Sequence, residues 1–124
     1  MIYIDTHIVV WLYTGQVKKL SDRSKDLLND NEIYISAVVR LELQCLAEIQ
    51  RITDEANQII SDLSNRIGLK ICDKSFNAIT NYSMDLIWTR DPFDRIIVAN
   101  AALNNDALVT KDRKILDHYE NALY

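Results

Sequence analysis

The fold of this chain is constrained most by short apolar runs that alternate with longer segments of helical periodicity. The runs lie at residues 1–4, 33–35, 69–72 and 107–110 and are rich in Ile, Leu, Val and Tyr. Such runs are typical of strands buried on both faces, and strands that alternate with helices form a parallel sheet covered on both sides. We therefore predict a three-layer α/β/α sandwich with a mainly parallel sheet of four to five strands, in which residues 121–124 form an edge strand.

The segments between these runs carry apolar residues at helical spacing. Gly15 and Gly68 each follow the last apolar residues of such a segment, as glycine does at helix C-termini. Two helices, capped by Ser36 and Thr53, are expected to follow one another without a strand between them. This pattern predicts a helical hairpin inserted after the second strand. The expected helices cover residues 6–14, 21–29, 36–49, 53–67, 75–86, 91–104 and 112–116, with Phe76, Ile79, Tyr82 and Leu86 facing inward.

The composition predicts a single domain that spans residues 1–124. Hydrophobic residues make up 48% of the chain and charged residues 26%, which suits one folded core at this length. Cys45 and Cys72 show no spacing typical of a zinc site, so we expect two reduced thiols. The apolar start of the chain is too short for a signal peptide or a membrane span. We therefore expect a cytoplasmic protein that does not associate with membranes.

The segment Asp91-Pro92-Phe93-Asp94-Arg95 predicts the abrupt start of a helix. Asp91 is a good N-cap, and Pro92 suits the first helical position. From Asp94, apolar residues follow at spacings of three, four and seven, so Asp94 shares the stripe expected to face the core. A carboxylate buried there without a partner would cost several kcal/mol. Asp94 therefore requires a partner from elsewhere in the chain or from a bound ion.

Three further carboxylates stand where they can meet Asp94. Asp5 and Asp112 directly follow expected strands, and the carboxyl ends of parallel strands share one edge of the sheet. Glu42 shares a helix face with Val38, Leu41, Cys45 and Ile49 in the same spacing pattern. A divalent cation, which prefers oxygen ligands, would be a common partner for all four carboxylates.

The net charge of −4 bears on the same hypothesis. An acidic surface argues against broad non-specific binding of nucleic acids. Carboxylates that hold a divalent cation no longer act as free negative charge. Other acids fit the site less well: Asp91 is explained as a cap, Asp106 precedes its strand and belongs to the opposite edge, and Asp73 is a rival on the correct edge.

In this order the residues resemble the PIN-domain family, and more narrowly the VapC-type ribonuclease toxins of bacterial toxin–antitoxin pairs. The similarity spans nearly the whole chain. It is carried by Ile4-Asp5-Thr6-His7, by Ser36 followed by Glu42, by Asp91-Pro92-Phe93-Asp94-Arg95 with Ala99 and Ala102, and by Leu108-Val109-Thr110-Lys111-Asp112.

The resemblance implies a parallel α/β/α sandwich and an endoribonuclease that depends on Mg²⁺ or Mn²⁺ and leaves a 5′-phosphate and a 3′-hydroxyl. It also implies an RNA substrate, with tRNA among the candidates, a cognate antitoxin protein and a homodimer. Residue by residue, Asp5, Glu42, Asp94 and Asp112 match the family's acidic quartet of catalytic and metal-binding residues. The two aspartates of the 91–95 segment leave open which is the ligand, and helix-face geometry favours Asp94.

Several neighbouring side chains are candidates for supporting roles. Thr6 and Thr110 are expected either to hydrogen-bond a ligating carboxylate or to serve only as a helix cap and a strand-end hydroxyl. Histidine is a residue type that often acts as a general base, but for His7 we favour a supporting role because a metal-bound water needs no histidine base. Candidates for contact with RNA phosphates are Arg40, Arg90, Arg95, Lys111, Arg113 and Lys114, while Trp11, Tyr13 and Trp88 are expected either to stack on bases or to join the core.

A receiver-like signalling domain that is phosphorylated on Asp73 is the main alternative from another functional class. It would use a similar sheet and the Thr110-Lys111 pair. It leaves Glu42 and Asp94 unexplained, and the helical hairpin interrupts its expected alternation. A purely structural interaction domain is the third hypothesis, and it predicts no dependence on divalent metal.

Overall fold

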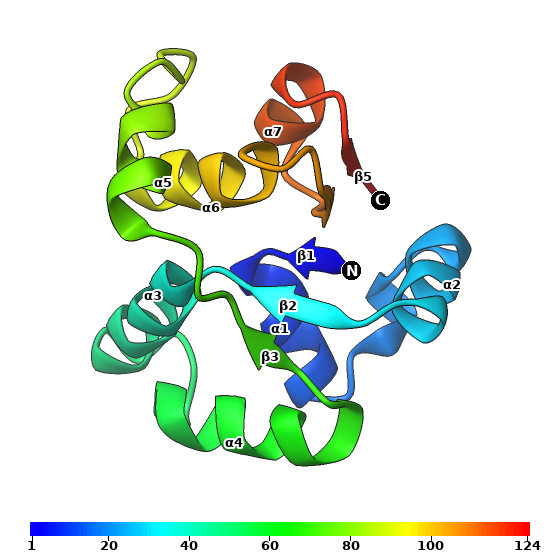
Figure 1. Ribbon diagram of the computed structural model, residues 1–124. Coiled ribbons are helices and arrows are strands. Elements are labelled where there is room, and N and C mark those ends of the chain that lie inside the picture. The colour runs from blue at the N-terminus through cyan, green and yellow to red at the C-terminus, as the bar shows by residue number, and fades with distance from the viewer.

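The computed structural model describes residues 1–124 and contains a five-stranded sheet in the order β3-β2-β1-β4-β5 (Figure 1). Every pair of neighbouring strands is parallel. The predicted α/β architecture is therefore confirmed, including the edge strand at the C-terminus. The strands are β1 (Ile2–Ile4), β2 (Ile33–Ile35), β3 (Lys70–Ile71), β4 (Ala107–Val109) and β5 (Ala122–Leu123).

Seven α-helices and one short 3₁₀ helix connect the strands. The predicted hairpin is present, because α3 and α4 both lie between β2 and β3 and pack against each other. The helices are α1 (Thr6–Tyr13), η1 (Val17–Lys19), α2 (Asp22–Asp30), α3 (Ala37–Glu48), α4 (Ala56–Ile67), α5 (Phe76–Ser83), α6 (Pro92–Ala102) and α7 (Arg113–His118).

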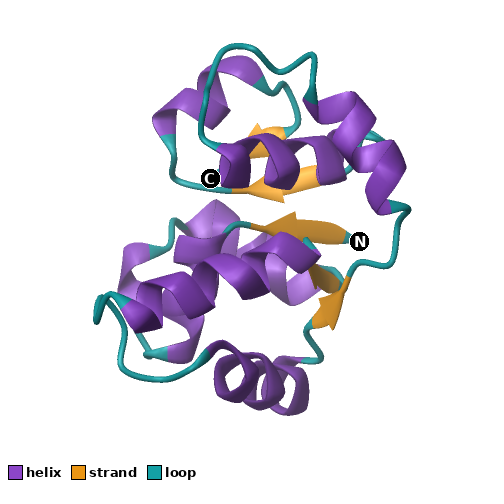
Figure 2. Cartoon of the chain, turned by 90° about the vertical axis from the view of Figure 1, so that its left-hand side faces the viewer, coloured by secondary structure: helices purple, strands orange, loops and turns teal.

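The strand order assigns the helices to the two faces of the sheet. From β1 to β3 the chain moves outward in one direction, and from β3 through β4 to β5 it moves in the other. Crossovers between parallel strands are right-handed, so these two halves place their helices on opposite faces. In Figure 2 the strands accordingly run between two groups of helices. Helices α3 and α6 nevertheless touch, which brings residues from both layers together.

The core consists of the strands and the apolar sides of the surrounding helices. Ile4, Ile35, Leu108 and Val109 are completely buried, as expected for strands covered on both faces. The register pairs Ile4 with Val109. The carboxyl ends of the two central strands, β1 and β4, therefore lie level with each other and fix the positions of the residues that follow them.

Most helix ends were predicted correctly, although α5 ends at Ser83 rather than near Leu86. Ser36 and Asp91 cap α3 and α6 through their side chains, and Gly68 ends α4 with a φ of 70°, a value that suits glycine. The expected cap at Thr53 is wrong, because α4 begins at Ala56 and has Glu55 at its N-cap without a side-chain hydrogen bond.

The predicted inward faces of α3 and α5 are partly wrong. Leu41 and Ile49 are 56% and 64% exposed, whereas Val39 and Leu43 are completely buried. Helix α3 is apolar on more than one side, so periodicity alone did not identify the buried side. In α5, Ile79 is buried as expected, but Phe76 and Tyr82 are exposed. None of the helices has both the length and the hydrophobicity needed to cross a membrane.

Candidate active site

Asp5 occupies the turn between β1 and α1. Its Oδ1 accepts a hydrogen bond of 3.2 Å from the backbone N–H of Ile8, so Asp5 caps α1. The hydroxyl of Thr110, at the end of β4, donates a hydrogen bond to the other carboxylate oxygen. The side chain is only 6% exposed, and burial raises its pKa. Thr110 thus has the predicted supporting role and holds Asp5 in one orientation.

Glu42 reaches the same region from α3. Its Oε1 accepts a hydrogen bond from the hydroxyl of Thr6, the first residue of α1. The pKa of Glu42 is raised, chiefly by burial. The hydrogen bond from Thr6 and the nearby His7 oppose this rise. Thr6 is therefore more than a residue of the first helical turn, because it fixes the position of a carboxylate that lies 36 residues away in the chain.

Asp91 and Asp94 stand at the start of α6. Asp91 accepts hydrogen bonds from the backbone N–H groups of Phe93 and Asp94, at 2.8 and 3.3 Å, which confirms its role as the cap. Asp94 lies in the first turn and is half-buried. Burial, followed by the negative charges of its acidic neighbours, raises the pKa of Asp94 to about 7. The environment of Asp94 thus disfavours its negative charge.

Asp112 caps the short helix α7. Its Oδ1 accepts hydrogen bonds of 2.8 and 3.2 Å from the backbone N–H groups of Lys114 and Ile115. Its own N–H donates to the hydroxyl of Thr110 at 3.0 Å. Thr110 therefore contacts both Asp5 and the residue that leads into α7, and it links the two strand-end acids.

These acids line a single small cavity of about 130 Å³. Its wall contains all four residues of the predicted quartet, which come from both helical layers and from two strand ends. Asp91 belongs to the wall as well, so the cap also adds a carboxylate to the cavity. The lining residues are Asp5, Thr6, His7, Glu42, Asp91, Asp94, Ile97 and Asp112.

The carboxylates form no ready-made cage for a metal, since no three of them lie in an arrangement that would hold an ion. Their oxygens accept hydrogen bonds from Thr6, Thr110 and backbone N–H groups instead. None of the five acids of the cavity takes part in a salt bridge. The donor chemistry of the cavity, five carboxylates without a basic partner, nevertheless suits a hard divalent cation.

The two rival acids lie outside the cavity. Asp73 follows β3 but is exposed and does not line the cavity. Asp106 precedes β4 and forms a salt bridge of 2.9 Å with Lys74. The sequence-based preference for the quartet over these two residues therefore agrees with where the side chains lie.

The other predicted site residues divide into two groups. His7 is exposed and lines the cavity, whereas Arg113 is exposed and lies outside its lining. Arg95 is used structurally, because its Nε donates a hydrogen bond of 2.7 Å to the carbonyl of Thr89. The hydroxyl of Thr89 also accepts one from the N–H of Asp91 at 3.2 Å. Thr89, which had no distinguishing sequence pattern, thus helps to position the start of α6.

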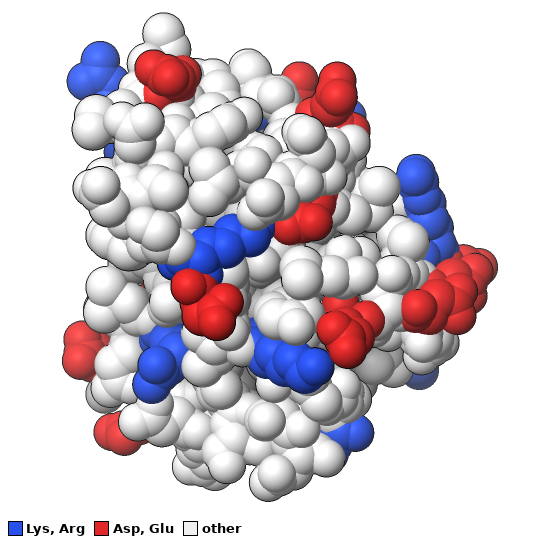
Figure 3. Space-filling view, viewed as in Figure 1, with Lys and Arg blue, Asp and Glu red and all other residues white.

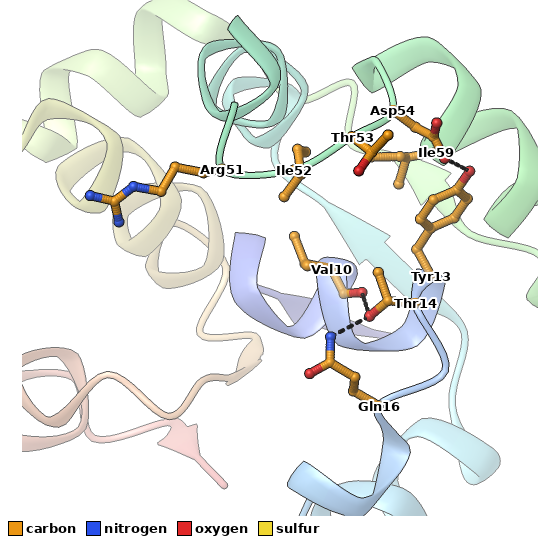
Figure 4. Close-up of a pocket in the computed structure, with 9 residues that line it drawn as sticks. All are labelled: Val10, Tyr13, Thr14, Gln16, Arg51, Ile52, Thr53, Asp54 and Ile59. Atoms are coloured by element: carbon orange, nitrogen blue, oxygen red, sulfur yellow. Dashed lines mark hydrogen bonds between the residues drawn. The ribbon is translucent and has the colours of Figure 1, made fainter. Parts of the chain in front are cut away.

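A larger cavity of about 290 Å³ lies at the far end of α1 (Figure 4). Tyr13 points across it to Asp54, and the two side chains form a hydrogen bond of 2.5 Å that raises the pKa of Tyr13. Arg51 points away from this pair in Figure 4. The cavity contains a single carboxylate, which Tyr13 already engages, so it lacks the cluster of chemical groups that the acidic cavity has.

The surface charge shows no broad basic region on the face drawn in Figure 3. Lys and Arg side chains there are interspersed with Asp and Glu. This distribution fits the acidic net charge of −4. On this face, nucleic acid would have to be bound through local contacts rather than through an extended basic surface.

The sequence model of the PIN domain matches residues 2–121. The chain belongs to the PIN-domain family. Ribonuclease VapC22 of Mycobacterium tuberculosis is 29% identical to it over 121 residues, which cover 94% of this chain and 91% of the relative. The predicted resemblance to VapC-type proteins is thus confirmed, and membership of the PIN family does not favour the receiver-like alternative.

Solved structures show the same fold. VapBC2 from Rickettsia felis, bound to a DNA fragment from its promoter, superposes with a TM-score of 0.71 at 24% identity, covering 99% of this chain and 96% of that one. A toxin–antitoxin complex from Klebsiella pneumoniae gives a TM-score of 0.70 at 21% identity, with coverage of 100% and 97%. The PIN fold is therefore shared along the full length of the chain.

Proposed function

We propose that this protein is a ribonuclease toxin of a toxin–antitoxin pair and that it hydrolyses phosphodiester bonds of RNA with the help of Mg²⁺ or Mn²⁺. The carboxylates of Asp5, Glu42, Asp94 and Asp112 would hold the ion. The observation that carries the proposal is the convergence of these four acids, from two strand ends and two helices, in one cavity where none of them forms a salt bridge. The similarity to Ribonuclease VapC22 supports RNA as the substrate.

The electrostatics of the cavity explain why a cation would bind. Burial and mutual repulsion raise the pKa of Asp94 to about 7. A divalent cation, when bound, ionises water, neutralises phosphate charge and stabilises the charge that grows in the transition state. It would also relieve the repulsion among the acids.

The protein's own residues orient these groups. Thr110 fixes Asp5, and Thr6 fixes Glu42, through hydrogen bonds to one carboxylate oxygen each. The other oxygen of Asp5, Oδ1, accepts a hydrogen bond from the backbone N–H of Ile8. The other oxygen of Glu42, Oε2, has no hydrogen-bond partner in the protein and would be available to a ligand in the cavity. Thr89 and Arg95 set the start of α6 and with it the position of Asp94.

The partners follow from the same proposal. The solved relatives with this fold include VapBC2 and a toxin–antitoxin complex, which supports a cognate antitoxin as the protein partner of this chain. We also propose a homodimer and a cytoplasmic location, where RNA substrates such as tRNA are present.

Cleavage of RNA by matched variants tests the proposal. Purified wild-type protein is expected to cleave RNA only with Mg²⁺ or Mn²⁺, and Asp94→Asn and Glu42→Gln are each expected to reduce the rate by roughly 100-fold or more. Asp73→Asn is the matched control, because it removes an exposed acid that follows a strand at the same edge but lies outside the cavity. It should leave the rate unchanged.

Two outcomes would contradict the proposal. Equal cleavage by the wild type and both cavity variants would mean that a contaminating nuclease is responsible. Loss of activity in Asp73→Asn together with labelling of Asp73 by acetyl phosphate would support the receiver-like alternative. Thermal melts of each variant must show that the fold is retained.

A further inference from the structure

A second hollow adjoins the acidic cavity. It has a volume of about 260 Å³ and is lined by Asp5, His7, Trp11, Lys111 and Asp112. Asp5, His7 and Asp112 also line the acidic cavity. A strand of nucleic acid with one phosphate at the acids would therefore extend directly into this hollow.

Trp11 provides an aromatic wall of the hollow. It lies in α1, five residues after Thr6, or roughly 8 Å along the helix axis. The side chain is half-buried and packs partly against the core. Its ring also faces two ammonium groups, with Nζ of Lys19 at 5.6 Å and Nζ of Lys111 at 5.8 Å from the ring centroid. A role in the core alone does not account for this polar side.

The two lysines are not neutralised by acids. Neither Lys19 nor Lys111 forms a salt bridge, although the cavity beside them holds several carboxylates. Tyr124 joins this group, because its hydroxyl donates to the carbonyl of Lys19 and its ring lies 5.6 Å from Nζ of Lys111. The C-terminal residue thus connects the two lysine-bearing segments. We call Trp11, Lys19, Lys111 and Tyr124 the basic-aromatic cluster.

The chemistry of this cluster matches one nucleotide of single-stranded RNA. Aromatic rings stack on bases of any sequence, and ammonium groups bind the adjoining phosphates. A protein with a net charge of −4 needs such local positive charge to hold a polyanion. We propose that the basic-aromatic cluster is a subsite in which the base of the nucleotide next to the cleaved bond stacks on Trp11, with Lys19 and Lys111 on its phosphate. This proposal rests on the proposed ribonuclease function.

Binding of RNA to a pair of Trp11 variants tests the stacking. We would measure the fluorescence anisotropy of a labelled single-stranded oligoribonucleotide with Mg²⁺, in the Asp94→Asn background so that the probe is not cleaved. Trp11→Leu keeps apolar volume but removes the ring, and we expect it to raise the Kd roughly 5- to 100-fold. Trp11→Phe keeps a ring and should remain within about threefold of the parent.

Lys19→Ala tests the charge without touching the core, since Lys19 is exposed. It should weaken binding and lower the slope of log K against log salt by about 0.7, the value for one phosphate contact on a single strand. Trp88→Phe is the control for aromatic substitution, because Trp88 stacks on His118 and does not line the hollow. It should not change the Kd.

The outcomes separate the subsite from the proposed function. If the wild type cleaves RNA with metal but Trp11→Leu and Lys19→Ala both bind as tightly as the parent, the subsite is wrong and the ribonuclease function stands. If the wild type neither binds nor cleaves RNA with Mg²⁺ or Mn²⁺, both proposals fail. Should Trp11→Leu not fold, an unchanged Kd and salt slope in Lys19→Ala overturn the subsite.

Discussion

The acidic residues at the two edges of the sheet differ in whether they form salt bridges. At the amino-terminal edge, Asp106 pairs with Lys74 at 2.9 Å and Glu32 pairs with Lys70 at 3.4 Å. At the carboxyl edge, five acids share one cavity and none forms a salt bridge. Buried or half-buried carboxylates without partners are costly. The amino-terminal acids are paired within the protein, whereas we propose that the acids at the carboxyl edge, three of which also cap helices, hold a ligand.

The largest expected effect is the stabilisation of the folded protein by metal bound at the carboxyl edge. Ligand that binds only the folded state stabilises it, by about 2.7 kcal/mol when its free concentration is 100 times the Kd. We expect Mn²⁺ to raise the Tm of the wild type and of Asp106→Asn by similar amounts and that of Asp94→Asn much less. Differential scanning fluorimetry measures this directly. A similar rise in all three proteins would mean that the metal binds elsewhere.

Replacement of Thr110 by valine should lower the affinity for metal at the carboxyl edge without removing an acid. Thr110 orients Asp5 and accepts the N–H of Asp112, and residues that orient ligands typically contribute 10- to 100-fold to metal affinity. We expect Thr110→Val to lower the affinity for Mn²⁺ by roughly that factor in isothermal titration calorimetry. Thr80→Val, at a threonine outside the cavity lining, is the control. Unchanged affinity in Thr110→Val would limit Thr110 to a structural role.

Removal of an acid at the amino-terminal edge should lower the stability of the fold but leave metal-dependent cleavage intact. The side chains of Lys74 and Asp106 are only 16% and 21% exposed. Asp106→Asn would leave the ammonium of Lys74 without its counter-ion and should destabilise the protein by about 1–3 kcal/mol. Urea denaturation measures this loss, and metal-dependent cleavage should persist in the folded protein. If Asp106→Asn lost cleavage while its stability stayed unchanged, the acids at the two edges would not have the different roles that we propose.

The pH dependence of stability should give the smallest effect. The pKa of Asp94 is raised from 3.8 to about 7 in the folded protein, so the folded state binds more protons than the unfolded chain between these values. Metal-free protein should therefore lose stability as the pH rises from about 4 to about 7. Asp5 and Glu42 have raised pKa values and contribute in the same direction.

Asp94→Asn isolates the share of Asp94 in this effect. Its metal-free Tm should fall less than that of the wild type over the same pH range, and Mn²⁺ should reduce the fall in the wild type. Identical pH profiles of the wild type and Asp94→Asn would show that neither burial nor the charges of its neighbours raise the pKa of Asp94.

The sequence predicted β1, β2 and β4 well, because β-branched apolar runs buried on both faces have few alternative structures. It predicted the inward stripe of α6 for a similar reason, since Ile97, Val98 and Ala101 are all buried. The run at residues 69–72 did form β3, but both residues of that edge strand are exposed rather than buried. The face of α3 could not be predicted in this way. Its apolar residues cover more than one side, and packing against neighbouring elements decides which side is buried.

The convergence of the four acids was predicted in part for the right reasons. Asp5 and Asp112 follow strands, and topology brings them to one edge. Glu42 does reach the cavity, although the stripe on which it was placed includes the exposed Leu41 and Ile49. Asp91 lines the cavity as well, and the sequence left its contribution open because its capping role already explained the residue. Contacts such as that of Thr6 with Glu42 depend on how α1 packs against α3, which periodicity does not encode.

The position of a bound ion tests the central claim most directly. Crystals of the protein soaked in Mn²⁺ can be examined by anomalous diffraction, which locates manganese without reference to the surrounding atoms. We expect an anomalous peak in the acidic cavity, from manganese bonded to oxygens of at least three of Asp5, Glu42, Asp94 and Asp112. An empty cavity at saturating Mn²⁺, or manganese bound only to acids such as Asp73 outside it, would contradict the account.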